Sequence, residues 1–253
     1  MNGWMNKIVK IDLSTGDKEL ITLDEEIRRK YIGGRGLGVK LFTEHCKKDI
    51  DPLSSENVIT FMTGPLTGVF PTAGRYQVTS KSPLTNTIST SSSGGFFGQK
   101  LKKAGFDGLI IAGRSSKPIY LNITDGNIEI KSADNLWGKN THDTMNLIQE
   151  NTKDKASIAC IGPAGENLVS YAAIMNDKDR ASGRGGLGAI LGSKNLKAIA
   201  VSGTTDIKIA NSEKLKKLHS KINRLIDKNP ITGKSLQVLG TSVLVNVINS
   251  HGM

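Results

Sequence analysis

Cysteine and histidine are scarce in this sequence of 253 residues, which holds two cysteines and four histidines. Cys46 and Cys160 fit neither a metal-binding spacing nor a disulfide framework, so a reduced, cytoplasmic setting is the simplest interpretation. The histidines are too scattered in the sequence for a metal cluster, and we expect surface positions for His45, His142, His219 and His251. No Ser/His/Asp or Cys/His catalytic arrangement can be argued from what remains.

Aromatic residues and long apolar runs are also few. Aromatics make up 5% of the chain and are not interleaved with the lysine-rich stretches, which argues against a nucleic-acid partner. We expect Lys100, Lys102 and Lys103 to form a solvated helix face. No apolar run approaches the ~18 residues of a membrane span, and residues 1–7 lack the apolar core of an export signal. The expected protein is globular, with no membrane segment.

Glycine and positive charge are what the chain has in excess. Its 28 glycines are about 11% of the residues, against ~7% in an average protein. Glycine at this level predicts many tight turns and close backbone approaches. The net charge of +11 attracts anions without choosing among phosphates, acidic lipid, nucleic acid and an acidic protein.

Hydrophobic patterning predicts an α+β fold built on a mixed β-sheet. Strands are predicted over residues 6–13, 18–23, 57–64, 74–82, 85–93, 107–113, 117–123, 127–132, 155–162 and 197–203. Helices are predicted over residues 24–32, 39–46, 95–105 and 141–152. We therefore expect a first domain over residues 1–210.

The composition changes after about residue 210. An apolar stripe at helical spacing is formed by Leu215, Leu218, Ile222, Leu225 and Ile226. Pro230 breaks this pattern, and a second apolar helix is expected over residues 236–248. Two such helices cannot bury their apolar faces alone. We expect residues 211–253 to be the truncated beginning of a helical second domain.

Two stretches of the first domain resemble each other. Gly95, Gly98 and the strand end at Gly113 recur, 90 residues later, as Gly185, Gly188 and Gly203. A Gly-Pro pair precedes each set, at residues 64–65 and 162–163. The spacing predicts a duplicated, pseudo-two-fold domain; the alternative is chance resemblance in a glycine-rich chain.

Each repeat places a glycine loop before a short helix, where free backbone N–H groups favour an anion. Arg75 precedes the first loop, and Arg180 and Arg184 flank the second. Arginine matches phosphate oxygens bidentately. Two equivalent loops imply a ligand with two anionic groups, or two copies of one ligand. The alternative is a structural glycine turn beside solvated arginines.

Several glycine motifs also have competing interpretations. Residues 183–188 satisfy the dinucleotide pattern G-x-G-x-x-G, with Asp206 near the place of a ribose-binding acid. The preceding residues are polar and the following helix is short, so a dinucleotide site is the weaker interpretation. Residues 33–38 are expected to form a helix-to-helix turn, and residues 162–167 a turn after a strand. The serines at 91–93 could cap the next helix.

Taken together, several strings resemble the N-terminal part of the tungsten-containing aldehyde:ferredoxin oxidoreductases. They are GGRGLG (33–38), GPLTG (64–68), GRYQVTSKSPLT (74–85), SGGFFG (93–98), AGFDG (104–108), IGPAGENLVSYAAIMND (161–177), RASGRGGLGAILGSKNLKAIAV (180–201) and GTSVLVNVIN (240–249). The resemblance implies an enzyme that oxidises aldehydes to carboxylic acids with ferredoxin as electron acceptor. The implied cofactor is tungsten, or molybdenum, held by two pterins whose phosphates are bridged by magnesium. The family's N-terminal domain is a pseudo-two-fold saddle beneath it.

The resemblance also implies which residues bind the cofactor. They are Arg75, Ser92, Gly94 and Gly95 in the first half, and Arg180, Ala181, Gly183 and Arg184 in the second. The family's magnesium ligands correspond to the carbonyl oxygen of Ala181 and to the side chain at position 92. That side chain is asparagine in the family and serine here. Serine can offer a hydroxyl oxygen to a hard cation, with a shorter reach.

The family's 4Fe-4S cluster is bound by four cysteines in later domains. Two cysteines cannot supply four thiolates, so we expect that this chain alone neither holds the cluster nor oxidises aldehyde. The implied partners are ferredoxin, the missing C-terminal domains or a subunit that carries them, and a second copy in a homodimer. The alternative is a non-catalytic pterin- or nucleotide-binding subunit or remnant.

Overall fold

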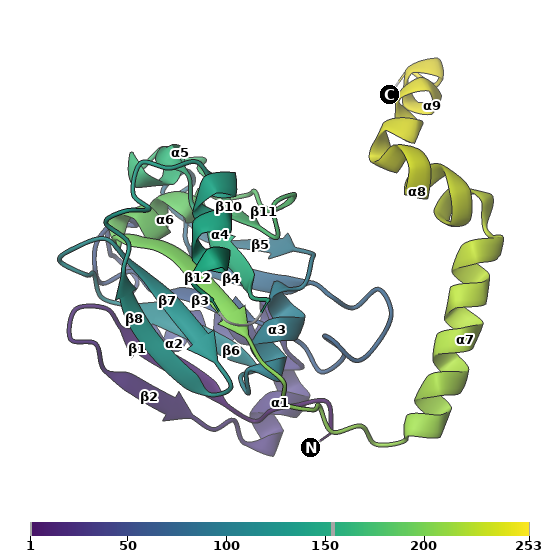
Figure 1. Cartoon of the computed structure of the whole chain (residues 1–253), viewed down its shortest axis with the longest axis horizontal. Helices are drawn as coiled ribbons and strands as arrows, with labels where there is room; N and C mark the ends of the chain where they lie inside the picture. The colour runs from purple at the N-terminus through teal and green to yellow at the C-terminus, as the bar shows by residue number, and fades with distance from the viewer. Residues whose placement is uncertain (1, 153–154, 253) are drawn as a thin grey trace. The chain divides into compact units, whose positions relative to one another are not determined.

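The computed structural model describes residues 2–152 and 155–252. The chain forms two compact units, Met1–Lys208 and Ile209–Met253. The first unit contains two six-stranded sheets with helices (Figure 1). This agrees with the predicted α+β fold and mixed sheet.

The first half of unit 1 holds one sheet and three helices. Its elements are β1 (Ile8–Asp12), β2 (Lys18–Ile21), α1 (Glu25–Tyr31), α2 (Gly34–His45), β3 (Ile59–Met62), β4 (Tyr76–Lys81), β5 (Ile88–Ser93), α3 (Phe97–Lys103) and β6 (Gly108–Ala112). The sheet order is β2-β1-β6-β3-β4-β5. Strands β1 and β6 are parallel, and every other neighbouring pair is antiparallel.

The second half repeats this arrangement. Its elements are β7 (Ile119–Thr124), β8 (Asn127–Ser132), α4 (Thr141–Glu150), β9 (Ser157–Cys160), α5 (Pro163–Glu166), β10 (Ile174–Asn176), β11 (Arg180–Ser182), α6 (Leu187–Ser193) and β12 (Leu196–Ser202). Read from the other edge, the sheet order is β8-β7-β12-β9-β10-β11. The parallel pair is again the first strand with the last, β7 with β12. The repeat of strand order and direction confirms the predicted duplication.

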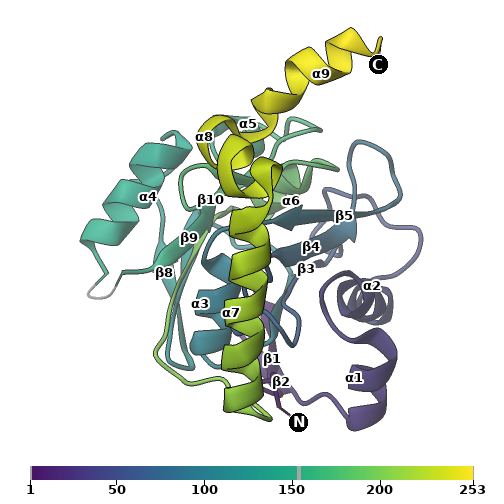
Figure 2. The same ribbon diagram turned by 90° about the vertical axis from the view of Figure 1, so that its right-hand side faces the viewer.

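One hydrophobic core joins the two halves. It contains buried side chains of both sheets together with Phe97 and Leu101 of α3 and Leu187 and Ile190 of α6. A second cluster packs α2 against the first sheet through Leu37 and other apolar residues. A third packs α4 against the second sheet. Figure 2, turned by 90°, shows α2 and α4 on opposite sides of unit 1. The layered packing fixes both halves as one body.

Most predicted elements are confirmed within a few residues, two short strands were not predicted, and two local predictions are wrong. The strands β10 and β11 have only three residues each and escaped a search for alternating segments. Residues 163–166 form the short helix α5 rather than a turn, with Pro163 at its first position. The turn expected over 33–38 is confined to Ile32 and Gly33, because Gly34–Gly38 already belong to α2.

Unit 2 is a series of helical segments. It contains α7 (Ser212–Lys228), a π-helical turn (Ile231–Ser235), α8 (Leu236–Leu239), a 3-10 turn (Gly240–Val243) and α9 (Leu244–Ser250). No described residue of this unit is buried. The single helix expected over 236–248 is interrupted at Gly240, whose φ is +59°.

The run Ile231–Ser250 also corrects one sequence expectation. By length and composition alone, these 20 residues suffice to cross a membrane. The run escaped notice because Gly233, Lys234 and Gly240 interrupt its apolar residues. A single run of this kind is a weak indication of membrane insertion.

Candidate anion-binding site

The two glycine loops lie where the halves of unit 1 meet. The first loop, Gly94–Phe96, connects β5 to α3, and the second loop, Gly183–Gly186, connects β11 to α6. Strands β5 and β11 are the edge strands of their sheets and lie beside each other. The duplicated motifs are therefore brought together although they are 90 residues apart in the sequence.

The second loop packs along β5. The backbone N–H of Arg184 donates to Ser91 Oγ over 3.2 Å. A Cβ placed on Gly185 would lie 2.0 Å from Ser89 Oγ, and the φ of Gly185 is +73°. Both the contact distance and the backbone conformation require glycine there. The second loop is thus fixed against the first half of the domain.

The first loop receives the reciprocal contact from the second half. A Cβ placed on Gly95, whose φ is +80°, would lie 2.3 Å from Asp177 Oδ2 and 3.3 Å from Arg180 Cγ. On the other side, a Cβ on Gly74 would approach the Gly95 carbonyl oxygen to 3.3 Å. Gly74 directly precedes Arg75, so arginines from both halves adjoin the first loop.

The start of α3 already has an anion, which corrects one sequence expectation. The backbone N–H of Phe96 donates to Asp177 Oδ2 over 2.6 Å. The helix has no capping side chain of its own, so the cap by Ser91–Ser93 suggested by the sequence is wrong. The carboxylate that takes this role is 81 residues away in the chain.

The start of α6 is closed in a different way. A Cβ on Gly186 would lie 1.8 Å from the Ser170 carbonyl oxygen, and Leu187 and Gly188 are buried. The backbone N–H of Gly188 donates to the Ala172 carbonyl oxygen over 2.9 Å. The N–H groups of Phe96 at α3 and of Gly188 at α6 are therefore already hydrogen-bonded within the chain. The groups that remain accessible lie on the loops and on β11.

The accessible groups are suited to a bulky anion. Arg75, Arg180 and Arg184 are exposed, as are Ala181 and Gly183. A Cβ on Gly183 or on Gly94 would meet nothing within 4 Å, so both backbone segments face open space. Charged guanidinium groups beside unobstructed backbone are the chemistry that phosphate recognition uses. The residues present fit a ligand with two phosphate groups.

A shallow cavity adjoins this site on the side of Arg75. Its volume is about 340 Å³, and Arg35 from the start of α2 and Gln77 of β4 are among its lining residues. The side-chain oxygen of Gln77 is buried and has no hydrogen-bond partner in the described part of the chain. Gln77 is paired in register with Ser92 on β5, so the strand that lines the cavity is next to the strand that carries the predicted magnesium ligand.

The dinucleotide interpretation of residues 183–188 is not supported by the topology. Strand β11 is three residues long and pairs antiparallel with β10 at the edge of its sheet. The strand after α6 is β12, which lies three places away in the sheet order. A dinucleotide fold requires a parallel neighbouring strand after the helix.

Beneath the loops lies a buried polar network that sequence reasoning missed. Asn176 Oδ1 accepts from Tyr76 Oη over 3.1 Å and from Ser93 Oγ over 2.5 Å. Its Nδ2 donates to the Gly94 carbonyl oxygen and to Asp177 Oδ2, each over 3.0 Å. Burial raises the pKa of Tyr76 well above its usual range. No sequence signal marked these residues, because their partners come from different halves.

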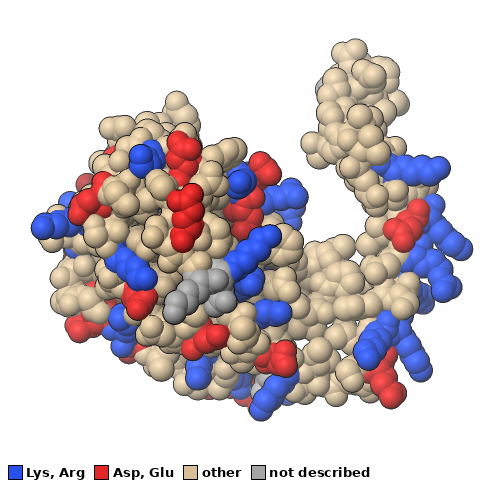
Figure 3. All heavy atoms as spheres, in the orientation of Figure 1, with Lys and Arg blue, Asp and Glu red and all other residues tan. Residues whose placement is uncertain are grey.

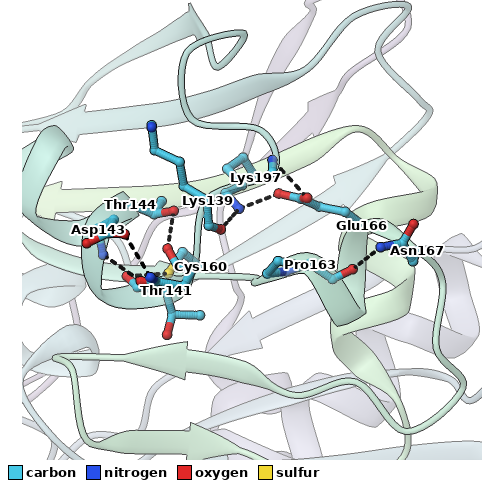
Figure 4. A network of polar contacts seen from close by, with 11 residues as sticks. Lys139, Thr141, Asp143, Thr144, Cys160, Pro163, Glu166, Asn167 and Lys197 are labelled. Atoms are coloured by element: carbon cyan, nitrogen blue, oxygen red, sulfur yellow. Dashed lines mark hydrogen bonds and ion pairs between the residues drawn. The ribbon is translucent and has the colours of Figure 1, made fainter.

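Among residues 2–152 and 155–252, three lysines are buried, one of them against expectation. Lys102, predicted to be solvated, is fully buried, and its Nζ donates to the carbonyl oxygens of Gly3 and Gly64. Burial lowers the pKa of Lys102 and of Lys194, each to about 8. Figure 4 shows Lys197 directed to Glu166 of α5 and to the carbonyl oxygen of Lys139. Through these hydrogen bonds, each buried lysine connects segments that are distant in the sequence.

The cysteines and histidines form no site. Cys160 is buried, and burial raises its pKa to about 12. His142 and His251 are exposed, and His45 and His219 are partly exposed. Among residues 2–152 and 155–252, no three His, Cys, Asp or Glu side chains are placed to hold a metal ion.

On the face drawn in Figure 3, basic and acidic side chains are intermingled over the sheets, and basic ones predominate over α7.

The fold and site define a duplicated two-sheet domain with arginine-bearing loops at the contact of its halves. Residues 8–203 match the family description "Aldehyde ferredoxin oxidoreductase, N-terminal domain". The whole chain is 46% identical to the tungsten-containing aldehyde ferredoxin oxidoreductase of Pyrococcus furiosus, and 45% identical to that of Thermococcus kodakarensis. The chain belongs to the aldehyde ferredoxin oxidoreductase family.

Two further relatives carry other substrate names. The WOR-like subunit of an aliphatic sulfonate oxidoreductase from Pyrococcus furiosus is 34% identical over 86% of this chain and 38% of its own length. The active site complex BamBC of benzoyl coenzyme A reductase superposes with a TM-score of 0.86 and 34% identity, over 89% of this chain and 35% of that one. The chain spans 42% of the length of the aldehyde ferredoxin oxidoreductases that it matches.

Proposed function

We propose that unit 1 binds a tungsten, or molybdenum, bis-pterin cofactor for the oxidation of aldehydes to carboxylic acids. The proposal is supported by the chain's family and by one structural observation. The two duplicated loops meet along β5 and β11, and three exposed arginines lie on them or beside them. A cofactor with two phosphate-bearing pterins has the matching two-fold arrangement of charge.

Each residue of the site has a proposed part in holding this cofactor. Arg75, Arg180 and Arg184 neutralise phosphate charge or donate hydrogen bonds to the pterins. Gly94 and Gly183 let the backbone approach, because no neighbouring atom would contact a Cβ there. Gly95 holds the first loop against Arg180. When bound, the metal supplies the redox chemistry, and this domain binds and orients it.

Magnesium between the phosphates is proposed to contact the carbonyl oxygen of Ala181 and the hydroxyl of Ser92. These two residues lie on β11 and β5, which are neighbouring strands. Oxygen donors of this type suit Mg²⁺, which keeps several of its waters. The serine side chain is shorter than asparagine, so we expect a water molecule between Ser92 and the ion.

The remaining activity is proposed to need polypeptide that this chain does not contain. We assign the 4Fe-4S cluster, the aldehyde pocket, the ferredoxin contact and any homodimer interface to that remainder, in a cytoplasmic enzyme. An aldehyde is preferred as the substrate over a sulfonate or an acyl thioester because the identity is 46% against 34%.

The test uses the full natural polypeptide that contains this chain, produced in a host supplied with tungstate and molybdate. Metal and pterin per polypeptide are measured after purification, together with aldehyde-dependent reduction of ferredoxin. We expect about two pterins and one metal per polypeptide. Arg184→Met should lower both contents, whereas Arg29→Met, at an exposed ion pair with Glu25, should not. Protein that carries neither pterin nor metal would contradict the proposal.

A non-catalytic role is the alternative. If no reading frame in the natural gene or beside it encodes the cluster cysteines, the chain is a pterin-binding subunit or remnant. Binding of NAD or NADP by the chain, without binding of a pterin phosphate, would instead favour a nucleotide-binding protein.

A further inference from the structure

The buried amide of Asn176 joins the two halves at the site. Its four hydrogen bonds reach Tyr76 on β4, Ser93 on β5, Gly94 in the first loop and Asp177 beside it. Asn176 itself is the last residue of β10 in the second half, and its exposed fraction is 0%. One side chain thus connects three positions of the first half to the second.

The chemistry of these partners fixes the orientation of the amide. The Gly94 carbonyl oxygen and the Asp177 carboxylate can only accept hydrogen bonds, so the NH₂ group must face them. The amide oxygen then accepts from the hydroxyls of Tyr76 and Ser93. All the usual hydrogen-bonding capacity of the amide is used. An aspartate at position 176 could not donate to either acceptor and would put a second carboxylate against Asp177.

The next residue, Asp177, also connects the second half to the first loop. Its Oδ2 accepts from the backbone N–H of Phe96 over 2.6 Å, and its Oδ1 accepts from Ser157. The Asp177 carboxylate occupies the space where a side chain of Gly95 would lie, because a Cβ on Gly95 would be 2.3 Å from Asp177 Oδ2. Every residue of the first loop therefore contacts Asn176 or Asp177.

We propose that Asn176 and Asp177 are positioning residues, which hold the first loop at the correct distance from the second for one ligand to contact both. This inference rests on the proposed cofactor. Arg180 and Ala181 follow Asp177 by only three and four residues, and β11 pairs directly with β10. Movement of this segment would displace proposed ligands of both halves together.

The experiment compares cofactor retention with folding in the full natural polypeptide. Asp177→Ala removes the acceptor for the Phe96 N–H and the Asn176 amide, and Ser93→Ala removes one donor to Asn176. Retention is measured as pterin and tungsten per polypeptide, and folding as the thermal midpoint of the cofactor-free protein. We expect Asp177→Ala to lower retention about tenfold and Ser93→Ala about threefold.

Two further variants separate positioning from general stability. Glu166→Gln breaks a buried ion pair with Lys197 away from the loops and should lower the thermal midpoint with little loss of pterin. Asp177→Asn keeps an oxygen acceptor toward Phe96 and should recover most of the retention lost in Asp177→Ala. Ser93→Ala serves as the test if Asp177→Ala does not fold.

The outcomes are distinct. Wild-type protein that retains no pterin overturns the proposed function. Wild-type protein that retains pterin, with Asp177→Ala retaining as much, overturns the positioning role alone. Loss of pterin in Glu166→Gln in proportion to its lower midpoint, matching the loss in Asp177→Ala, also overturns that role, because stability would then explain both.

Discussion

At the scale of single residues, the glycines of the two loops have different physical reasons. Gly185 and Gly95 lack side chains because neighbouring atoms occupy the space, and each has a positive φ. Gly183 and Gly94 face open space, so nothing within this chain excludes a side chain there. A glycine that the fold does not require is a candidate for close approach by a ligand.

This contrast gives the first prediction. Gly185→Ala should lower the free energy of unfolding by about 2 kcal/mol or more, because a Cβ would overlap Ser89 and favour a different φ. Gly183→Ala should leave it within about 0.5 kcal/mol and instead reduce pterin retention. Urea denaturation of the chain and pterin assay of the full polypeptide provide the two measurements. Equal destabilisation by both substitutions would contradict the assignment.

A second residue-scale prediction concerns Lys194. Its Nζ is buried and donates to the Gly113 carbonyl oxygen, and burial lowers its pKa to about 8. Between pH 8 and its unfolded pKa of ~10.4, the unfolded chain binds the extra proton, so stability rises with pH. Relative to Lys194→Met, the wild type should gain about 2 kcal/mol of unfolding free energy from pH 8 to pH 10. Denaturant titrations at several pH values measure it; parallel curves for the two proteins would refute it.

At the scale of elements, α5 is held by charge. Glu166 joins this four-residue helix to Lys197 on β12 and also accepts from the Gly138 N–H over 2.9 Å. Both charged side chains are buried, at 5% and 0% exposure. A helix of one turn has little stability of its own, so we infer that this ion pair determines where α5 lies.

Removing the charge of one member of the Glu166–Lys197 pair should therefore lower the free energy of unfolding substantially. Glu166→Gln is expected to lower the unfolding free energy by about 3 kcal/mol, because Lys197 is left as an uncompensated buried charge. Glu129→Gln breaks an exposed pair with Lys131 and should cost at most about 1 kcal/mol. The double variant Glu166→Leu, Lys197→Met should recover most of the loss. The urea midpoints of the variants measure these changes. Equal losses of unfolding free energy in Glu166→Gln and Glu129→Gln would contradict the role given to the buried ion pair.

At the scale of the whole molecule, all three hydrophobic clusters draw on residues between Trp4 and Val201. Unit 2 leaves its apolar side chains uncovered, including Val238 at 81% exposure. We expect a chain ending at Lys208 to unfold within about 2 °C of the full 253 residues. It should also bind less of a hydrophobic dye. A collapse of the thermal midpoint on truncation would show that unit 2 supports the core.

The cysteine content of the whole molecule limits the chemistry of the isolated chain. With two cysteines, one of them buried, it should bind no 4Fe-4S cluster after reconstitution with iron and sulfide. Aldehyde-dependent dye reduction by the isolated chain should be absent. A stoichiometric cluster or clear turnover would overturn this expectation.

The sequence by itself determined the α+β class, the duplication and most elements, because hydrophobic period and glycine spacing are local signals. It also singled out Arg75, Arg180 and Arg184 as a candidate site. It failed at β10 and β11, which are too short to show a period, and at Lys102, whose neighbours suggested a solvated face.

Only the tertiary structure decided which residues cap α3 and hold the first loop in place. The carboxylate of Asp177 caps α3 from 81 residues away, and Asn176 reaches residues up to 100 positions distant. Such partners meet because two sheets with the same topology pack edge strand beside edge strand. Hydrogen bonds between distant residues leave no periodic trace in a sequence, since their geometry exists only after the core has assembled.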